Sequence, residues 1–250
     1  MTRALRRGHP IGYTPRTVPF SMESCMATDR LDTPGRELFP EYPSLPGMYA
    51  REVDGLTEAQ RGRRRPEKSW GKWSIREQVS HMAYVNYRWF LGNWGPILFG
   101  DRPPRDMRLA DTGGADRMMD PRLKLDLAGL LAALKDGCDL AWEILGNETL
   151  GSLREKVFTR RLAPDQAWPS GDSPMDWLRN TMMKAHPRGV RIDEKDPSLV
   201  HYDLECTFRH VLWEGHAHLR TIQAHKQDEG LKIAVPLDPG AGYLKWLRWE

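Results

Sequence analysis

Two side chains near the end of the chain, Glu214 and His218, have types and a spacing that suit a metal site. They lie four residues apart in LECTFRHVLWEGHAHLRTIQAH, the stretch from Leu204 to His225. In a helix this stretch gathers its apolar residues into one stripe, and Glu214 and His218 stand one turn apart at its edge. A carboxylate and an imidazole placed there could bind a metal inside a helix bundle. They could equally form an ordinary pair on one helix.

The composition indicates a globular chain with a real core. Apolar residues make up 40% of the 250 residues and charged residues 28%, which suits one sizeable domain with appendages. The net charge of +3, from 37 basic and 34 acidic residues, does not suggest the concentrated basic face of a nucleic-acid binder. No apolar run is long enough for a membrane helix. The three cysteines are widely spaced and form no CxxC pair, so we expect a cytoplasmic protein without disulfides or a cysteine zinc site.

The helix expected around His81 has the clearest local start. Ser74 and Glu77 match a capping box, in which Ser74 accepts from the amide three residues on and Glu77 reaches back. Apolar residues keep helical spacing from there to Gly92 or Gly95. His81 lies at the flank of the apolar face, where a single histidine is more often a hydrogen-bonded core or surface residue than a ligand.

Three further segments have helical spacing, whereas strand-like alternation is scarce. We expect helices from about Pro46 to an end between Gly55 and Gly62, from an N-cap at Asp120 to Gly146, and from Leu199 or Asp203 to His225. Prolines break residues 147–200 into a crossover with one short helix at 176–185. The pattern predicts an all-α protein, a four-helix bundle with long crossover connections and irregular N- and C-terminal extensions.

These elements divide the chain into three parts. Residues 1–40 are expected to form a poorly structured arm, residues 41–228 the bundle, and residues 229–250 a tail. The apolar side chains of the tail could fold back as a clasp or face a partner chain: Leu244, Trp246, Leu247 and Trp249.

Two segments together resemble the DinB-like family of metal-binding helical bundles. KWSIREQVSHMAYVNYRWF is similar to the second-helix signature of that family, and FRHVLWEGHAHLRTIQAH is similar to its last-helix signature. GMYAREVDGLTEAQR resembles its first helix, so the resemblance covers roughly residues 42–226. It implies a four-helix bundle whose three inward-facing side chains bind a divalent metal.

The family pattern transfers to His81 as the first ligand and His218 as the last, and it departs at Glu214, where a histidine is commoner. A carboxylate remains a competent ligand for zinc, nickel, manganese or iron. His216 lies two residues from His218, about 160° around the helix, which places it outside the site. His210 extends the row 210, 214, 218 and could orient a ligand or replace one. His225 lies near the same face, two turns further on.

The resemblance also implies an activity. Family members with known activity are S-transferases and isomerases that act with low-molecular-weight thiols. The first hypothesis is therefore a metal-dependent enzyme that transfers such a thiol to an electrophile. Arg88 or Arg220 would meet an anionic group of the thiol. Related bundles often dimerise, so a homodimer is a plausible assembly.

Two alternatives belong to other classes. The first is a non-catalytic bundle that binds a metal or small molecule, or a stress-associated interaction module, with the long insertions and the tryptophan-rich tail as partner surfaces. The second is DNA binding through the run RGRRR at residues 61–65. A solvated loop between two helices explains that run more simply.

Overall fold

A computed structural model describes residues 30–245 of the chain. The chain divides into two units, Met1–Arg30 and Leu31–Glu250, and all the described helices and strands belong to the second. Most of the predicted N-terminal arm and the residues Trp246, Leu247 and Trp249 of the tail lie outside the described residues.

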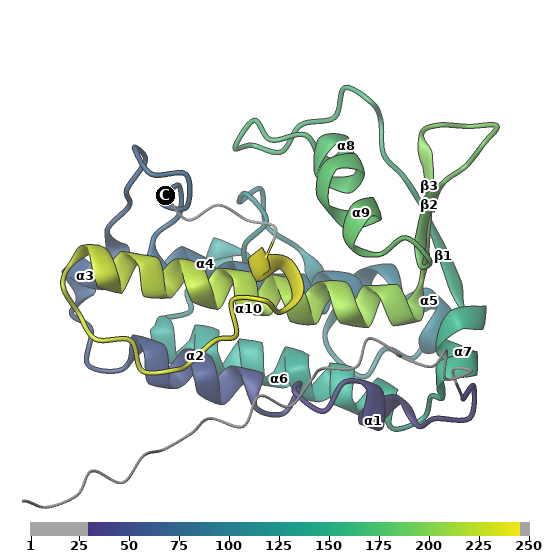
Figure 1. The fold of residues 1–250 in the computed structure, drawn as a ribbon, viewed down its shortest axis with the longest axis horizontal. Helices are drawn as coiled ribbons and strands as arrows, with labels where there is room; N and C mark the ends of the chain where they lie inside the picture. The colour runs from purple at the N-terminus through teal and green to yellow at the C-terminus, as the bar shows by residue number, and fades with distance from the viewer. Residues whose placement is uncertain (1–29, 246–250) are drawn as a thin grey trace, which may run out of the picture. The chain divides into compact units, whose positions relative to one another are not determined.

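Four long helices form the framework of the second unit. They are α2 (Leu45–Val53), α4 (Ile75–Tyr87), α6 (Leu127–Leu145) and α10 (Leu204–Asp228). Their main contacts join α2 to α6, α6 to α4, α4 to α10 and α10 back to α2, which closes a ring (Figure 1). The expectation of an all-α four-helix bundle is confirmed for the framework.

Local capping explains where these helices begin. Both hydrogen bonds of the capping box at Ser74 and Glu77 are present at the start of α4, and the Asp203 side chain caps α10 by accepting from the Cys206 amide. The predicted cap at Asp120 is real but opens only a short 3₁₀ turn, because Lys124 then adopts a left-handed conformation with φ of 50°. The long helix α6 therefore begins later, with Asp126 as its N-cap.

Shorter elements connect the four helices. A π-helical segment, η1 (Arg88–Asn93), extends α4 close to the predicted end of that helix. The predicted short helix at 176–185 is present as three consecutive helical segments that together span residues 174–185. The remaining helical elements are α1 (Gly35–Leu38), α3 (Glu58–Gly62), α5 (Gly95–Leu98), η2 (Met107–Ala110), η3 (Pro121–Leu123), α7 (Leu150–Glu155), α8 (Pro174–Trp177), η4 (Leu178–Met182), α9 (Met183–Ala185) and η5 (Gly242–Lys245).

A small antiparallel sheet departs from the all-helical expectation. Its strands β1 (Val157–Arg161), β2 (Val190–Ile192) and β3 (Leu199–Asp203) lie in the order β1-β3-β2. The predicted helix start at Leu199 is therefore wrong, and the alternative start at Asp203 is right. Phe158 pairs with Tyr202 and Arg160 with Val200, so these four side chains share one face of the sheet because alternate residues point the same way.

Parts of both predicted extensions pack against the bundle. The Gly35 amide donates to the Glu148 carbonyl at 2.7 Å, and the Gly151 amide to the Leu31 carbonyl at 2.8 Å, so residues 31–40 are part of the domain. The tail is anchored through a buried carboxylate on α2. Glu52 accepts from Lys226 Nζ at 2.7 Å and from the amide of Val235 at 3.0 Å, and Leu244 folds back into a buried position.

The core between α2 and α10 is close-packed and keeps these two helices in register. The Tyr49 hydroxyl donates to the Gly215 carbonyl at 2.6 Å, and the Tyr42 hydroxyl donates to the Phe208 carbonyl at 2.8 Å. A Cβ at Gly215 would lie 2.8 Å from Leu45 Cδ2, so a larger residue there would force the Leu45 side chain to shift. The packing leaves the opposite side of α10, which faces α4, for the polar side chains of the site.

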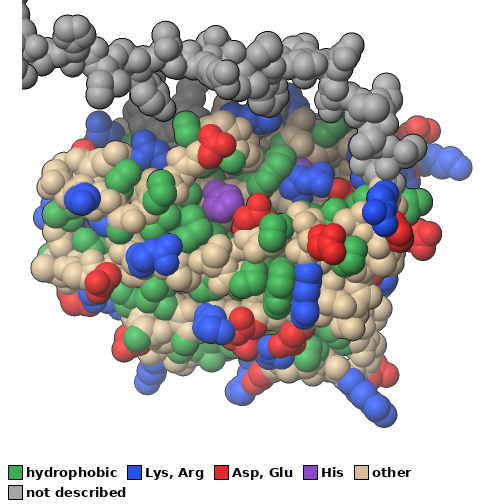
Figure 2. Space-filling model, turned by 60° about the horizontal axis from the view of Figure 1, so that its bottom comes forward, with side chains coloured by type: hydrophobic (Ala, Val, Ile, Leu, Met, Phe, Trp, Pro, Cys, Tyr) green, Lys and Arg blue, Asp and Glu red, His purple; other side chains and the backbone are tan. Residues whose placement is uncertain are grey.

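Among the described residues, the arginines that motivated the DNA-binding hypothesis lie in ion pairs. The four arginines of the run at 61–65 each pair with a carboxylate: Arg61 with Glu58, Arg63 with Glu229, Arg64 with Glu77 and Arg65 with Asp228. On the face in Figure 2, acidic and basic side chains are interspersed among apolar ones. Among residues 30–245, no helix combines the length and the apolar character that a membrane crossing needs.

Candidate metal centre

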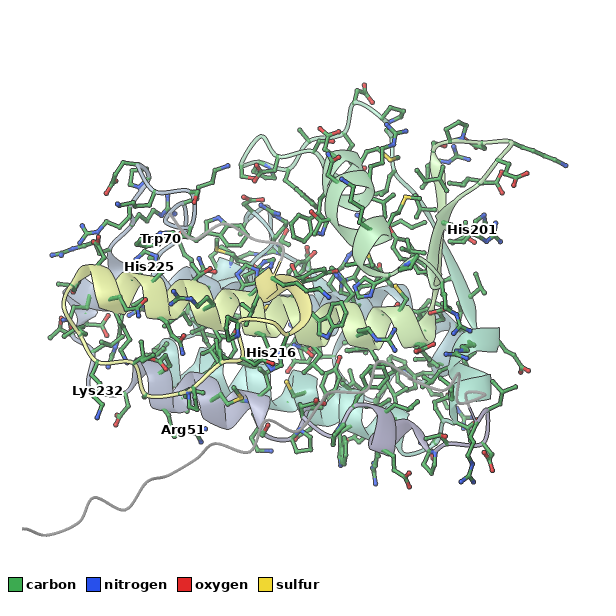
Figure 3. The ribbon with its side chains drawn as sticks, in the orientation of Figure 1. Arg51, Trp70, His201, His216, His225 and Lys232 are labelled. Atoms are coloured by element: carbon green, nitrogen blue, oxygen red, sulfur yellow. The ribbon has the colours of Figure 1, made fainter. Side chains whose placement is uncertain are left out.

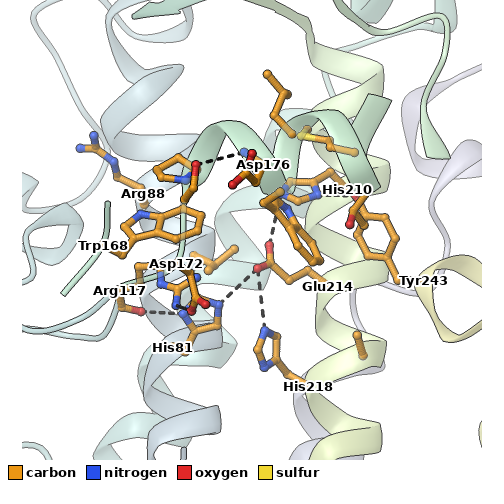
Figure 4. Close-up of a pocket in the computed structure, with 18 of the residues that line it drawn as sticks. His81, Arg88, Arg117, Trp168, Asp172, Asp176, His210, Glu214, His218 and Tyr243 are labelled. Atoms are coloured by element: carbon orange, nitrogen blue, oxygen red, sulfur yellow. Dashed lines mark hydrogen bonds and ion pairs between the residues drawn. The ribbon is translucent and has the colours of Figure 1, made fainter. Parts of the chain in front are cut away.

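The structure brings His81 of α4 together with Glu214 and His218 of α10. One ligand-type atom from each of the three lies within 4.8 Å of the other two. His81 Nε2 is 3.2 Å and His218 Nε2 is 3.8 Å from the same oxygen, Glu214 Oε1 (Figure 4). The helical spacing of four residues and the contact between α4 and α10 together produce this arrangement.

Both imidazole rings are held by their other nitrogen. His81 Nδ1 donates to the Arg117 carbonyl at 2.6 Å, and His218 Nδ1 donates to Gln78 Oε1. The Gln78 amide nitrogen donates to the Trp73 carbonyl at 3.4 Å, which keeps its oxygen turned toward His218. With Nδ1 engaged in this way, the neutral form of each ring presents the lone pair of Nε2 to the centre, which is how histidine ligands of metals are usually oriented.

The electrostatics of the trio favour a cation at its centre. Burial raises the pKa of Glu214, but His210, His218 and His81 outweigh this effect and hold that pKa well below its usual range. Burial and the neighbouring His81 lower the pKa of His218 to about 4, although Glu214 opposes them. A carboxylate that stays ionised beside a neutral imidazole is a donor set that suits a divalent ion, so these residues fit the metal that the motif resemblance implies.

His210 begins a buried polar chain on the other side of Glu214. Its Nε2 lies 3.3 Å from Glu214 Oε2, and its Nδ1 lies 2.7 Å from the Tyr243 hydroxyl. That hydroxyl lies 2.9 Å from His186 Nε2. If His210 donates to the carboxylate, Tyr243 must donate to His210 and accept from His186. The chain ends at His186 Nδ1, which is buried without a hydrogen-bond partner.

Sequence reasoning identified His210 but not Tyr243 or His186. Tyr243 lies in the tail, 33 residues beyond His210, and His186 belongs to the crossover. Neither has a spacing relation to the histidines of α10 that a sequence pattern could reveal. The contact depends on how the tail folds back.

A cavity of about 890 Å³ adjoins the trio, a size typical of small-molecule sites. Its walls come mainly from the segments between the long helices and include five tryptophans: Trp70, Trp73, Trp89, Trp168 and Trp177. The Arg117 guanidinium lies 4.7 Å from the Trp73 ring centroid and 4.0 Å from that of Trp168, and it pairs with Asp172 at 3.3 Å. The residue that orients His81 through its carbonyl thus also joins two walls of the cavity.

The other candidate residues do not belong to the trio. His216 lies on the side of α10 away from Trp70 and His225, as Figure 3 shows, and outside the trio. His225 Nε2 hydrogen-bonds the Trp73 carbonyl at 2.9 Å and its ring packs against Trp70, so it supports the cavity wall. Arg88 lines the cavity, whereas Arg220 donates to Gln227 at 2.8 Å and does not line the cavity.

We expect Gln78→Leu to weaken metal binding about 10- to 100-fold, because His218 Nδ1 would lose the acceptor that orients its ring. The affinity can be measured by competition with a chelator of known affinity. Gln78→Glu keeps an acceptor in the same place and serves as the control with near-normal affinity. Equal affinities for Gln78→Leu and the unchanged protein would contradict this role.

Stability is expected to fall as the pH drops below about 6.5, the ordinary pKa of histidine. Burial lowers the pKa of His186 to about 3, so His186 stays neutral in the fold while the unfolded chain takes up the proton. The folded pKa lies below the unfolded one, so this contribution is complete above pH of about 7 and is lost toward acid. Between pH of about 7.5 and 5 the free energy of unfolding should therefore fall less in His186→Gln than in the unchanged protein, by at most about 2 kcal/mol. Urea unfolding of both proteins in EDTA tests this, and identical losses would contradict it.

Comparisons with known proteins add one structural neighbour. No family model matches the chain, and no curated protein matches it. Among solved structures, the chain is similar to YfiT from Bacillus subtilis, described as a probable metal-dependent hydrolase with an unusual four-helix bundle topology. The two share 16% sequence identity with a TM-score of 0.48, over 88% of this chain and 95% of that one.

Proposed function

We propose that the chain is a metal-dependent enzyme whose divalent ion is held by His81, Glu214 and His218. The observation that carries the proposal is the convergence of two oriented Nε2 atoms and one carboxylate within 4.8 Å, beside a cavity of about 890 Å³. Zinc, nickel, manganese and iron accept such ligands. Three protein ligands leave coordination positions open, as catalytic sites require and structural sites do not.

The residues around the trio have separate tasks in this proposal. When bound, the ion supplies Lewis acidity that favours loss of a proton from a thiol or a water molecule at its open position. Arg117 and Gln78 hold the two imidazole rings, and His210 faces the second oxygen of Glu214. The tryptophans of the cavity give a substrate an apolar wall to pack against.

The reaction we propose is transfer of a low-molecular-weight thiol to an electrophile. The thiol is suggested by the motif resemblance, and the state of the described cysteines agrees with a nucleophile from outside the chain. Cys138 and Cys206 are both buried. Burial raises the pKa of both thiols, to about 12 for Cys138, so neither is a ready thiolate.

The long insertions, and the part of the tail that the structure describes, contribute to the cavity. The long crossover supplies Leu162, Trp168 and Trp177 to the cavity wall. Tyr243 of the tail reaches the same cavity and packs against His210. For the described part of the chain, these contacts favour a small-molecule site over an interaction module.

The proposal is tested by assaying the protein as purified, after dialysis against EDTA, and after adding back each metal. Conjugation of glutathione or cysteine to chlorodinitrobenzene measures thiol transfer, and hydrolysis of a nitrophenyl ester measures use of water. We expect thiol transfer to disappear with the metal and to return with it. Unchanged thiol transfer after complete removal of metal would overturn the proposal. Metal-dependent hydrolysis without thiol transfer would replace the thiol by water.

A further inference from the structure

Two arginines of the cavity have no role in holding the trio. Arg88 lies on η1, directly after α4, and Arg160 lies on β1. Both line the same cavity as His81, Glu214 and His218. Figure 4 shows Arg88 on the α4 side of the cavity, across from His210 and Tyr243.

Neither guanidinium group has an acidic partner among the described residues. The third cavity arginine, Arg117, pairs with Asp116 and Asp172, whereas no ion pair or side-chain hydrogen bond in residues 30–245 involves Arg88 or Arg160. The acidic groups of the cavity do not compensate them either. Asp172 pairs with Lys72 and Arg117, and Glu214 faces histidines. Asp176, the third acidic residue of the cavity, forms no ion pair with either arginine among the described residues.

The position of Arg160 is unusual for a charged residue. It shares the inner face of the sheet with Phe158, Val200 and Tyr202, of which Val200 and Tyr202 are buried. The outer face carries the polar pair Thr159 and His201, which hydrogen-bond at 2.9 Å. A positive charge on the apolar face of a sheet costs free energy unless a counter-charge meets it.

The charges of Arg88 and Arg160 both influence the pKa of the same neighbouring group, Tyr84. Burial raises the pKa of Tyr84, and Arg88 and Arg160 both oppose that rise. Burial lowers the pKa of Arg160, and the positive charge of Arg88 lowers it further. Two like charges held near each other beside an open cavity produce a positive potential that an anion would neutralise.

We propose that Arg88 and Arg160 form a subsite for an anionic group, a carboxylate or a phosphate, on the substrate that occupies this cavity. Arginine suits both groups because its planar fork can donate two parallel hydrogen bonds. Arg88 follows His81 by seven positions, which is nearly two full helical turns and a rise of about 10 Å along one face. The substrate therefore spans a comparable length, with its reacting group at the trio and its anionic group near the sheet. This inference rests on the proposed function in one respect: the anionic group is taken to belong to the substrate of that enzyme.

Calorimetric titration of the full-length protein with benzoate, phenyl phosphate and neutral benzamide tests the subsite. The three probes share an aromatic ring, so the difference between them reports the charge, and the two anions separate a carboxylate site from a phosphate site. We expect at least one anion to bind about tenfold more tightly than benzamide, and Arg160→Gln or Arg88→Gln to abolish this difference. Arg160→Lys keeps the charge and should retain part of it.

Arg161→Gln is the matched control, because it removes the same charge from the neighbouring position of β1. Arg161 pairs with Asp196 at 3.1 Å outside the cavity, and its substitution should leave anion binding unchanged. Equal binding of benzoate, phenyl phosphate and benzamide, or equal losses in the Arg160 and Arg161 variants, would overturn the proposal.

Titrations before and after dialysis against EDTA separate the two proposals. Anion binding that persists without metal supports the subsite whatever the fate of the metal site. Failure of anion binding in a protein that retains its metal overturns the subsite alone.

Discussion

His218→Ala is expected to lose stoichiometric binding of a divalent metal, with an affinity at least about 100-fold weaker, because removing a ligand exceeds the 10- to 100-fold cost of disturbing one. His218 contributes an Nε2 atom oriented by its hydrogen bond to Gln78, and the remaining His81 and Glu214 make a two-ligand site. Metal content of the purified proteins is measured by mass spectrometry. Added metal at about 100 times its dissociation constant should stabilise the unchanged protein by about 2.7 kcal/mol and the variant far less.

His216→Ala is the matched control for this experiment. His216 lies two residues away on the same helix and outside the trio, so its removal changes the histidine count equally but spares the site. It should retain the metal and the stabilisation. A metal content that is unchanged in His218→Ala, or reduced equally in both variants, would exclude the trio as the binding site.

Lys226→Met is expected to destabilise the fold by about 3–5 kcal/mol, the usual cost of leaving one member of a buried ion pair without its partner. The Lys226–Glu52 pair is 2.7 Å long, and its side chains are only 6% and 0% exposed. Glu52 would keep its bonds from the amides of Ala234 and Val235, but these donors do not replace a full positive charge. The free energy of unfolding is obtained from urea denaturation.

Lys135→Met provides the contrast, because the pair of Lys135 with Asp139 is similarly short but exposed. That pair spans 2.6 Å with exposures of 65% and 45%, so its loss should cost no more than about 0.5 kcal/mol. The double variant Glu52→Gln, Lys226→Met should recover part of the stability, because no buried charge is left alone. If the free energy of unfolding of Lys226→Met falls by less than about 1 kcal/mol, the prediction is contradicted, because Glu52 would then not depend on Lys226 to balance its charge.

The sequence predicted those parts of the fold that depend on neighbouring residues. The capping box at Ser74 and the cap at Asp203 are contacts over three residues, and both define helix starts in the structure. The relation of Glu214 to His218 is likewise local, because one turn of helix determines it. The third member of the trio, His81, came from motif resemblance, since no local pattern relates positions 133 residues apart.

The sequence did not predict features that depend on contacts between residues far apart in the chain. The strands β1 and β3 pair residues such as Phe158 and Tyr202, and each strand is only five residues long within a proline-rich segment. So short an alternation of apolar and polar residues does not identify a strand until its partner strand is known. The anchoring of the tail to Glu52 and the contact of Tyr243 with His210 are equally non-local.

The order of helices around the ring has a consequence for the rate of folding. In chain order the four long helices are α2, α4, α6 and α10, yet only the α4–α6 interface joins two that follow each other. The interface of α2 with α10 joins segments separated by roughly 150 residues. Such contacts must wait for distant segments to meet, and proteins rich in them fold slowly. We therefore expect slower folding than in a bundle of hairpin-connected helices, with His81 meeting Glu214 and His218 only when the last helix docks.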